Sequence, residues 1–274
     1  MLQNIQRKRI ILQKENNKMT GNELKEKIKE LVTSYVKAYP SNNGTPEMWR
    51  TPLVGFADVN DPYIRALPEI VTKEHQMPED FMEDPKVIIS YFIPFTKELA
   101  DKNIGIEDNA ASESWADAYK ITNAMMAKLN EYLVAELKGM GYRAVIPTNA
   151  GMHTDILKSY WSQRHIAYSA GLGTFGINNM LITKDGCCGR YNSIVADIPV
   201  EADKHLEEEN CLYKTKGLCK KCVQNCFSGA LTTEGFDRRK CYETCEKNME
   251  RYGVDVCGKC VTNIPCAFIA PKVK

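Results

Sequence analysis

Residues 211–226 read CLYKTKGLCKKCVQNC, and residues 257–266 read CGKCVTNIPC. Nine of the eleven cysteines in the chain fall in this part of the sequence, where Cys241 and Cys245 stand between the two stretches. Such closely spaced cysteines are typical of a metal-binding cage. Where a chain holds two [4Fe-4S] clusters, the cysteine that ends each compact run binds the cluster of the other run. The spacing therefore predicts two such clusters near the end of the chain.

This crossed pattern assigns four thiolates to each cluster. The first-cluster set consists of Cys211, Cys219, Cys222 and Cys266. The second-cluster set consists of Cys226, Cys241, Cys257 and Cys260. These eight ligands leave Cys187, Cys188 and Cys245 without an assigned role. We expect the first two of these, which stand between two glycines, to occupy a turn between two strands rather than to bind a metal.

Two other uses of these cysteines have to be weighed. Disulfides are disfavoured because the number of cysteines is odd and because no apolar signal segment opens the sequence. Zinc also binds Cys-x-x-Cys pairs, usually with two pairs in one site. Here each pair is followed by a further cysteine, although Phe227 and Ala267 stand where ferredoxins have a proline. A zinc-bound interaction module stays open as an alternative.

The chain is too long to be a ferredoxin alone. Its 274 residues leave about two hundred ahead of the cysteines, enough for one substantial globular domain. We expect a flexible basic extension at 1–19, an α/β domain at 20–205 and a small ferredoxin-like domain with both clusters at 206–274. The net charge of +1 and the lack of a long apolar run favour neither a nucleic-acid-binding arm nor membrane association.

Helix and strand patterns alternate through the predicted α/β domain. Thr20-x-x-Glu23 forms a capping box at the start of an amphipathic helix, which a loop at 40–46 should end. The apolar run VIISYFI at 87–93 predicts a central strand with both faces covered. A long helix at 114–138 and a strand at 143–146 follow. The alternation is typical of a layered α/β or α+β domain.

A glycine-rich segment lies between residues 161 and 199. Gly171-x-Gly173-x-x-Gly176 nominally matches a dinucleotide-binding fingerprint, but a helix should precede it and a strand should follow it, which is the wrong context. The glycines can instead let the backbone approach a large, flat ligand. An alternative without any ligand is a helix C-cap at Gly171 followed by close strand packing at Gly173.

A family resemblance rests on this segment and on the cysteines. Residues 170–178 read A-G-L-G-x-x-G-x-N, and residues 189–199 read G-R-x-x-S-x-V-x-D-x-P. Together with the cysteine spacing, these motifs make residues 85–266 resemble the epoxyqueuosine reductase family and the related reductive dehalogenases. The resemblance implies a nitroreductase-like α/β domain that binds cobalamin, followed by a ferredoxin-like domain with two [4Fe-4S] clusters. It also supports Cys241 as a ligand and leaves Cys245 free.

The same resemblance implies a function. Electrons from a low-potential donor such as ferredoxin or flavodoxin would pass through the clusters to a corrinoid and then to an unidentified substrate, in the cytoplasm. The cobalamin would lie beside Gly171, Gly173, Gly176 and Asn178. The seven residues between the first two cysteines resemble a shorter subgroup that is common in anaerobes. A non-catalytic electron-transfer or corrinoid-handling protein stays open as the second interpretation.

Departures from the family pattern concern the proton donor and the substrate. The reductases carry a catalytic aspartate after the strand that corresponds to 143–146, whereas this chain reads Pro-Thr-Asn-Ala at 147–150. The candidate proton donors are His153, Tyr160, Arg164 and His165, of which Arg164 and His165 could equally be packing residues. The sequence shows no counterpart of the C-terminal repeats that help the reductases to hold tRNA, which with the charge near zero argues against tRNA as substrate.

Overall fold

The computed structural model describes residues 19–148, 152–153 and 155–271. Its centre is an antiparallel sheet in the order β1-β2-β8-β3. The strands are β1 (Leu53–Asp58), β2 (Val87–Pro94), β8 (Gly189–Ala196) and β3 (Ala144–Val145). The extension predicted at 1–19 lies outside the described residues except for Met19. The mixed fold of helices and sheet agrees with the predicted layered domain.

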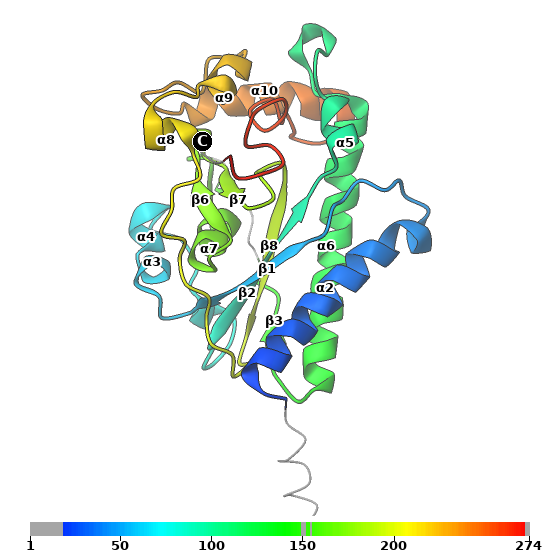
Figure 1. Ribbon diagram of the computed structural model, residues 1–274, viewed down its shortest axis with the longest axis vertical. Helices are drawn as coiled ribbons and strands as arrows, with labels where there is room; N and C mark the ends of the chain where they lie inside the picture. Colours follow the sequence, from blue (N-terminus) through cyan, green and yellow to red (C-terminus); the bar gives the residue numbers. More distant parts are fainter. Residues whose placement is uncertain (1–18, 149–151, 154, 272–274) are drawn as a thin grey trace, which may run out of the picture.

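Helices cover both faces of this sheet (Figure 1). The long helices α2 (Gly21–Asn43) and α6 (Glu113–Gly139) lie side by side on one face. The short helix α7 (Gln163–Ser169) lies on the other face, against β1, β2 and β8. The structure therefore confirms the helix predicted at 114–138 and the sheet predicted between two helical layers.

Helices cover strand β2 on both faces, and all eight of its residues are buried. Ile89 and Tyr91 pack with α2 and α6, whereas Ile88 and Phe92 pack on the opposite side with α7. Successive side chains of a strand point to opposite faces, so a strand covered on both sides has to be apolar throughout. Each large side chain buried in this way contributes about 2 kcal/mol.

Helix α2 begins as predicted but ends later. The Thr20 side chain accepts a hydrogen bond from the Glu23 N–H (3.3 Å), and the Glu23 carboxylate accepts one from the Thr20 N–H (2.8 Å). The predicted stop at Pro40 is wrong, because the helix continues to Asn43. Pro40 stands in the last turn, where its ring removes one backbone bond without unwinding the end. Gly44 closes the helix in the left-handed conformation, with a φ of 62°.

Shorter elements complete the described structure. Two of them form a hairpin from the glycine-rich segment, β6 (Gly173–Phe175) and β7 (Leu181–Thr183). The others are α3 (Pro62–Arg65), α4 (Leu67–Ile70), η1 (Pro78–Asp80), α5 (Lys97–Asp101), η2 (Glu107–Asn109), β4 (Met152–His153), β5 (Lys158–Ser159), α8 (Leu212–Lys216), α9 (Lys221–Asn225) and α10 (Arg238–Tyr252). Strand β1 lies in a stretch for which the sequence predicts only a polar region. Among the described helices, none combines the length and the apolar character needed to cross a membrane.

The cysteine-rich segment, residues 211–271, lies at the end of the sheet where α6 begins (Figure 1). Val256, Val261 and Ile264 from this segment share an apolar core with Phe95 and Trp115 from the sheet and α6. The segment is therefore packed on the sheet and α6 rather than suspended from them.

Residues 199–210 connect the sheet to the cysteine-rich segment. Polar contacts hold this stretch against the rest of the protein. Asp203 accepts a hydrogen bond from Lys25 Nζ (2.6 Å) and another from the Phe56 N–H (2.9 Å). His205 Nε2 lies 2.5 Å from an oxygen of Asp61. Near the cysteines, Asn210 Nδ2 donates to the carbonyl of Ile182 (2.7 Å). We name this stretch the linker.

Candidate metal centres

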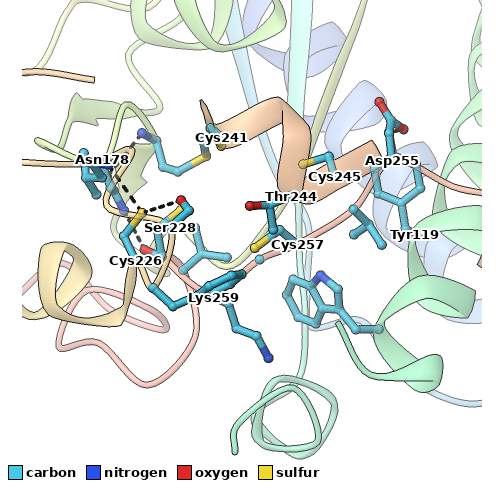
Figure 2. Close-up of a pocket in the computed structure, with 18 of the residues that line it drawn as sticks. Tyr119, Asn178, Cys226, Ser228, Cys241, Thr244, Cys245, Asp255, Cys257 and Lys259 are labelled. Carbon is cyan, nitrogen blue, oxygen red and sulfur yellow. Dashed lines mark hydrogen bonds between the residues drawn. The ribbon is translucent and has the colours of Figure 1, made fainter. Parts of the chain in front are cut away.

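The second-cluster set surrounds a cavity of about 240 Å³, which we name the second cavity. Cysteines from the end of α9, from α10 and from the turn at 257–260 line its wall, and Figure 2 shows several of them pointing inward. These cysteines are Cys226, Cys241, Cys245, Cys257 and Cys260. The four predicted ligands thus come together in space, and the unassigned Cys245 joins them.

The first-cluster set surrounds a smaller cavity, of about 20 Å³, which we name the first cavity. Its cysteines are Cys211, Cys219, Cys222 and Cys266. The rest of its wall comes from the β6–β7 hairpin and from the prolines at 265 and 271. The structure therefore gathers the two predicted sets around two separate cavities, each with the four cysteines that the crossed pattern assigns to it.

In both cavities, neighbouring thiols alter one another's pKa. Burial, together with the nearby Cys266, Cys211 and Cys219, raises the pKa of Cys222 to about 12. Burial likewise raises the pKa of Cys260 well above its usual value, helped by Cys257 and other cysteines of its set. Crowded, buried thiols resist ionisation unless a cation offsets their charge. A cationic iron–sulfur core fits this donor set, because each thiolate would bind its own iron atom.

Cys241 and Cys245 stand one turn apart on α10 and both reach the second cavity. The Cys245 thiol donates a hydrogen bond to the Cys241 sulfur, and this bond lowers the pKa of Cys241 to about 7. Arg164 and Arg238 lower the same pKa, against the effect of burial. The same bond, together with burial, raises the pKa of Cys245. Both thiols line the cavity, and the assignment of Cys241 as the ligand stays a prediction.

Cys187 and Cys188 lie between β7 and β8, and both are buried. Their backbone N–H groups donate to the carbonyls of Cys266 (2.9 Å) and Ala267 (3.0 Å). The Cys187 thiol also donates to the Cys266 sulfur, which lowers the pKa of Cys266 and raises that of Cys187. Burial raises the pKa of Cys188 to about 12. This pair holds the end of the cysteine-rich segment against the sheet.

Asn178 lies in the wall between the two cavities and lines both of them. Its Nδ2 donates to the carbonyl of Cys260 (2.9 Å), and its Oδ1 accepts a hydrogen bond from the Met180 N–H (3.2 Å). Figure 2 shows its side chain close to Cys226. The sequence assigns Asn178 to a cobalamin site, whereas the contacts in the structure join it to the cysteine-rich segment.

The three glycines assigned to cobalamin face protein atoms. Gly171 has a φ of +68° just after α7, and a Cβ there would strike the carbonyl of Lys204. At Gly173 a Cβ would strike the carbonyl of Ile182, and at Gly176 it would lie 2.6 Å from Oδ1 of Asn178. Chain packing alone accounts for these glycines, as the ligand-free alternative proposes. Of the three, Gly176 also lines the first cavity.

The candidate proton donors are spread over several elements. His153 lies in β4, and its side chain is outside the part of the chain that the structure describes. Tyr160 is half-buried, and its carbonyl accepts a hydrogen bond from the N–H of Gln76 (2.8 Å). Arg164 is nearest to the cysteines, and its Nη1 donates to the carbonyl of Asn179 (2.6 Å).

His165 points into an aromatic group rather than toward the cysteines. Its ring lies 4.8 Å from that of Phe175 and 6.1 Å from that of Tyr63, and its Nδ1 is 2.7 Å from Oγ of Ser162. Burial, together with the charge of Arg164, lowers the pKa of His165 to about 4. A neutral, packed imidazole of this kind is a poor proton donor near pH 7.

Several residues of the second cavity have no counterpart in the sequence predictions. Tyr119 donates a hydrogen bond to Asp255 (3.1 Å), and the guanidinium of Arg190 lies 4.1 Å from the centroid of the Tyr119 ring. Figure 2 places Tyr119 and Asp255 on the side of the cavity where Cys245 lies. The only sequence signal was the Gly-Arg pair at 189–190, because the other two residues come from distant segments.

Gly258 shows how closely this cavity is built against α6. Its φ is +77°, and a Cβ at this position would lie 2.5 Å from three atoms of the Trp115 ring. Only glycine adopts this conformation without strain and leaves room for the indole.

Within the described residues, no three His, Cys, Asp or Glu side chains converge closely enough to hold a single metal ion.

Comparison with known proteins identifies the fold. No protein-family model and no curated protein matches the sequence. Epoxyqueuosine reductase from Bacillus subtilis, with its catalytic aspartate loop swung out of the active site, aligns at a TM-score of 0.54 and 18% identity, over 90% of this chain and 66% of that chain. The same enzyme class with an epoxyqueuosine-modified tRNA-Tyr stem loop aligns at 0.53 and 18%, over the same shares.

A catabolic reductive dehalogenase in complex with 3-bromo-4-hydroxybenzoic acid aligns at a TM-score of 0.56 and 17% identity, over 78% of this chain and 30% of that chain. This chain thus spans 66% of the length of the reductases and a smaller share of the dehalogenase. The chain has the fold of epoxyqueuosine reductase and reductive dehalogenase, which confirms at the level of fold the resemblance seen in its glycine-rich segment and cysteine spacing.

Proposed function

We propose that this protein is an iron–sulfur oxidoreductase that passes low-potential electrons through two [4Fe-4S] clusters to a substrate. The observation that carries the proposal is the gathering of the predicted cysteines around two separate cavities. Clusters bound by four cysteines exchange single electrons and can reach potentials of about −400 mV and below. The fold, shared with two classes of reductase, agrees with such chemistry.

The residues of the chain have distinct tasks in this proposal. The eight cysteines would hold the two clusters, and Asn178 separates them while fixing the backbone at Cys260. Apolar side chains such as Trp115 and Val256 exclude water from the second cavity. In a dry cavity the charge of Arg190 acts strongly on anything bound beside it.

The resemblance also implies a corrinoid as the electron acceptor. Of the glycines assigned to that cofactor, Gly171 and Gly173 pack against protein backbone and Gly176 against the side chains of Asn178 and Ile182, while Asn178 itself is bound to the cysteine-rich segment. The residues present therefore do not form a fitting cradle, and we derive no step through a corrinoid. Its binding is the second arm of the experiment below.

A non-catalytic electron-transfer protein is the second candidate function. It is favoured by the packed, neutral His165 and by the absence of the family aspartate from residues 147–150. In that case the substrate would be another electron carrier, and no proton donor would be needed. Under both functions the unpaired state of the eleven cysteines suits the reducing cytoplasm, which is where we place the protein.

The experiment is anaerobic reconstitution with iron and sulfide, followed by metal analysis and EPR of the dithionite-reduced protein. We expect about eight iron atoms and as many acid-labile sulfides per chain. Bound zinc without sulfide would overturn the proposal in favour of a structural zinc module. A Cys222→Ser/Cys260→Ser double variant is the matched control, because it removes one ligand from each cavity.

The second arm titrates the reconstituted protein with cob(II)alamin and follows the cobalt EPR signal. A saturable change in the cobalt ligand field would support a corrinoid-dependent reductase. Unchanged cobalamin beside normal cluster signals would remove the corrinoid and favour electron transfer to another acceptor. The double variant distinguishes binding that depends on the clusters from binding that does not.

A further inference from the structure

The surface beside the first cavity carries an unusual concentration of charge. The twelve residues from Cys211 to Cys222 include four lysines and no acidic residue, in a chain whose net charge is only +1. These lysines are Lys214, Lys216, Lys220 and Lys221. Lys214 is partly neutralised by Glu209 at 3.2 Å, whereas Lys216 and Lys220 are exposed and form no salt bridge within the described residues, although the charge of Lys220 acts on Glu234.

An exposed apolar side chain stands between these lysines. Leu218 is 80% exposed and directly precedes Cys219, a residue of the first cavity. A leucine this open to water is held out by the local backbone, because Gly217 before it is left-handed with a φ of 70°. The combination of an apolar centre and a charged rim is typical of a protein-binding surface.

The last part of the described chain extends this surface. Pro265 and Pro271 line the first cavity together with Cys219, so the C-terminal segment lies beside the lysine-rich loop. Ile269, between these prolines, is 60% exposed. The Ala270 N–H donates to the carbonyl of Lys184 (3.1 Å), which adds a further cationic residue to this neighbourhood. We use the name lysine-rich surface for the two exposed apolar residues and the five lysines of this neighbourhood, which are Leu218, Ile269, Lys184, Lys214, Lys216, Lys220 and Lys221.

We propose that the lysine-rich surface is the docking site of a small acidic one-electron carrier protein of the ferredoxin type, which delivers electrons to the first cavity. The inference rests on the proposed function, since it assumes clusters in both cavities. Charge complementarity favours an acidic partner, because opposite charges steer encounter and raise the association rate. Exposed Leu218 and Ile269 supply the apolar contact that holds the encounter complex together.

A rival entry point lies beside the second cavity, where the exposed apolar side chain is more covered than Leu218. Phe227, next to Cys226, is 44% exposed. The pocket beside it is lined largely by amide side chains, including Asn103, Gln224 and Asn225, and its one cationic lining residue among those described, Lys259, donates to the carbonyl of Asn103 (2.8 Å). Arg238, Arg239 and Lys240, which directly precede Cys241 of the second cavity, are also exposed, so charge alone does not separate the two entry points. The larger exposure of Leu218, 80% against 44% for Phe227, favours entry at the first cavity.

The test is stopped-flow reduction of the reconstituted protein by a purified, reduced acidic [2Fe-2S] ferredoxin at several ionic strengths. In a Lys216→Glu/Lys220→Glu variant we expect the second-order rate constant at low ionic strength to fall about tenfold or more and its salt dependence to flatten or reverse. A Lys37→Glu/Lys73→Glu variant, with the same charge change at two exposed lysines elsewhere, should behave as the wild type. Leu218→Ser should weaken the complex while leaving the salt dependence intact.

Dithionite separates the outcomes, since this small reductant needs no docking site. Variants with full iron content and normal dithionite reduction, but no change in their reaction with ferredoxin, would overturn the docking site and leave the proposed function standing. Failure of the wild-type protein to form clusters would overturn both. Slow ferredoxin reduction in a Phe227→Ala variant with wild-type rates in the lysine variant would move the entry point to the second cavity and refute the proposal.

Discussion

The two cysteine-lined cavities differ in size and in what surrounds them. The first, of about 20 Å³, is enclosed by its four cysteines, by the β6–β7 hairpin and by the C-terminal segment. The second, of about 240 Å³, has a fifth cysteine, and it reaches Trp115, Tyr119 and Asp255. The first cavity is thus the tighter of the two around its four sulfur atoms. The second has mainly apolar and aromatic walls with a few polar groups such as Tyr119 and Asp255, and it is the larger space.

The largest effect should come from removing one ligand of each cavity separately. Cys222→Ser should abolish the cluster of the first cavity and Cys260→Ser that of the second, so each variant should keep about four of eight iron atoms. Iron and sulfide analysis, with EPR of the reduced variants, would check this. Cys188→Ala, which removes a buried thiol outside both sets, is the control and should keep all the iron. Full iron content in either ligand variant would contradict the assignment.

A comparison of Cys241 with Cys245 tests the second cavity alone. Cys241→Ser should lose most of its cluster, because the hydrogen bond from Cys245 and the nearby arginines prepare Cys241 as a thiolate. Cys245→Ser keeps a donor at the same place and should retain the cluster. Iron content and the EPR line shape would be measured for both. If Cys241→Ser kept the cluster and Cys245→Ser lost it, Cys245 would be the ligand, and the second-cluster set would have to be revised.

The metal-free protein should show a pH difference between the cavities. The pKa of Cys241 is lowered to about 7, so its thiolate is present above that pH and lost below it. The pKa of Cys222 is raised to about 12, so this thiol stays protonated through neutrality. Alkylation at pH 8, followed by mass spectrometry, should modify Cys241 at least about a hundredfold faster than Cys222. Equal rates would mean that the cavities do not differ in this way.

A smaller effect should follow from filling the contact between the second cavity and α6. Gly258→Ala adds a Cβ 2.5 Å from the Trp115 ring in a left-handed conformation, and should lower the free energy of unfolding by about 3 kcal/mol. Gly253→Ala is the matched control, since it has a φ of +73° but nothing within 4 Å of the added atom, and should lower it by about 1 kcal/mol. Chemical denaturation of the reconstituted protein would compare them. Equal losses would show that Trp115 moves aside.

Local patterns allowed some elements to be predicted from sequence. The capping box at Thr20 and Glu23 and the apolar run of β2 depend on neighbours in the chain, so propensity and periodicity reveal them. The grouping of cysteines followed from spacing, because short runs can only place their thiols together. Strand β1 was missed because its burial depends on pairing with β2, which no local signal announces.

The remaining parts of the candidate site depend on tertiary packing. Tyr119 and Asp255 are 136 positions apart and meet only because α6 and the cysteine-rich segment fold together. Gly171 and Gly173 suggested a ligand, yet their neighbours Lys204 and Ile182 are supplied by other segments of the protein. A sequence shows that a position needs glycine, but it does not show whether a cofactor or the chain itself fills the space.

The linker has a consequence for how the protein unfolds. Its contacts with Lys25, Phe56, Asp61 and Ile182 are made from Asp203, His205 and Asn210, and they reach α2, β1 and β7 in turn. Anchors arranged in this way must break together before the cysteine-rich segment can leave the sheet. The sequence becomes cysteine-rich after residue 205, but the part of the chain that follows should not unfold independently of the sheet. The protein should melt in one cooperative transition, and the spacing between its cysteine-lined cavities and the sheet should stay constant.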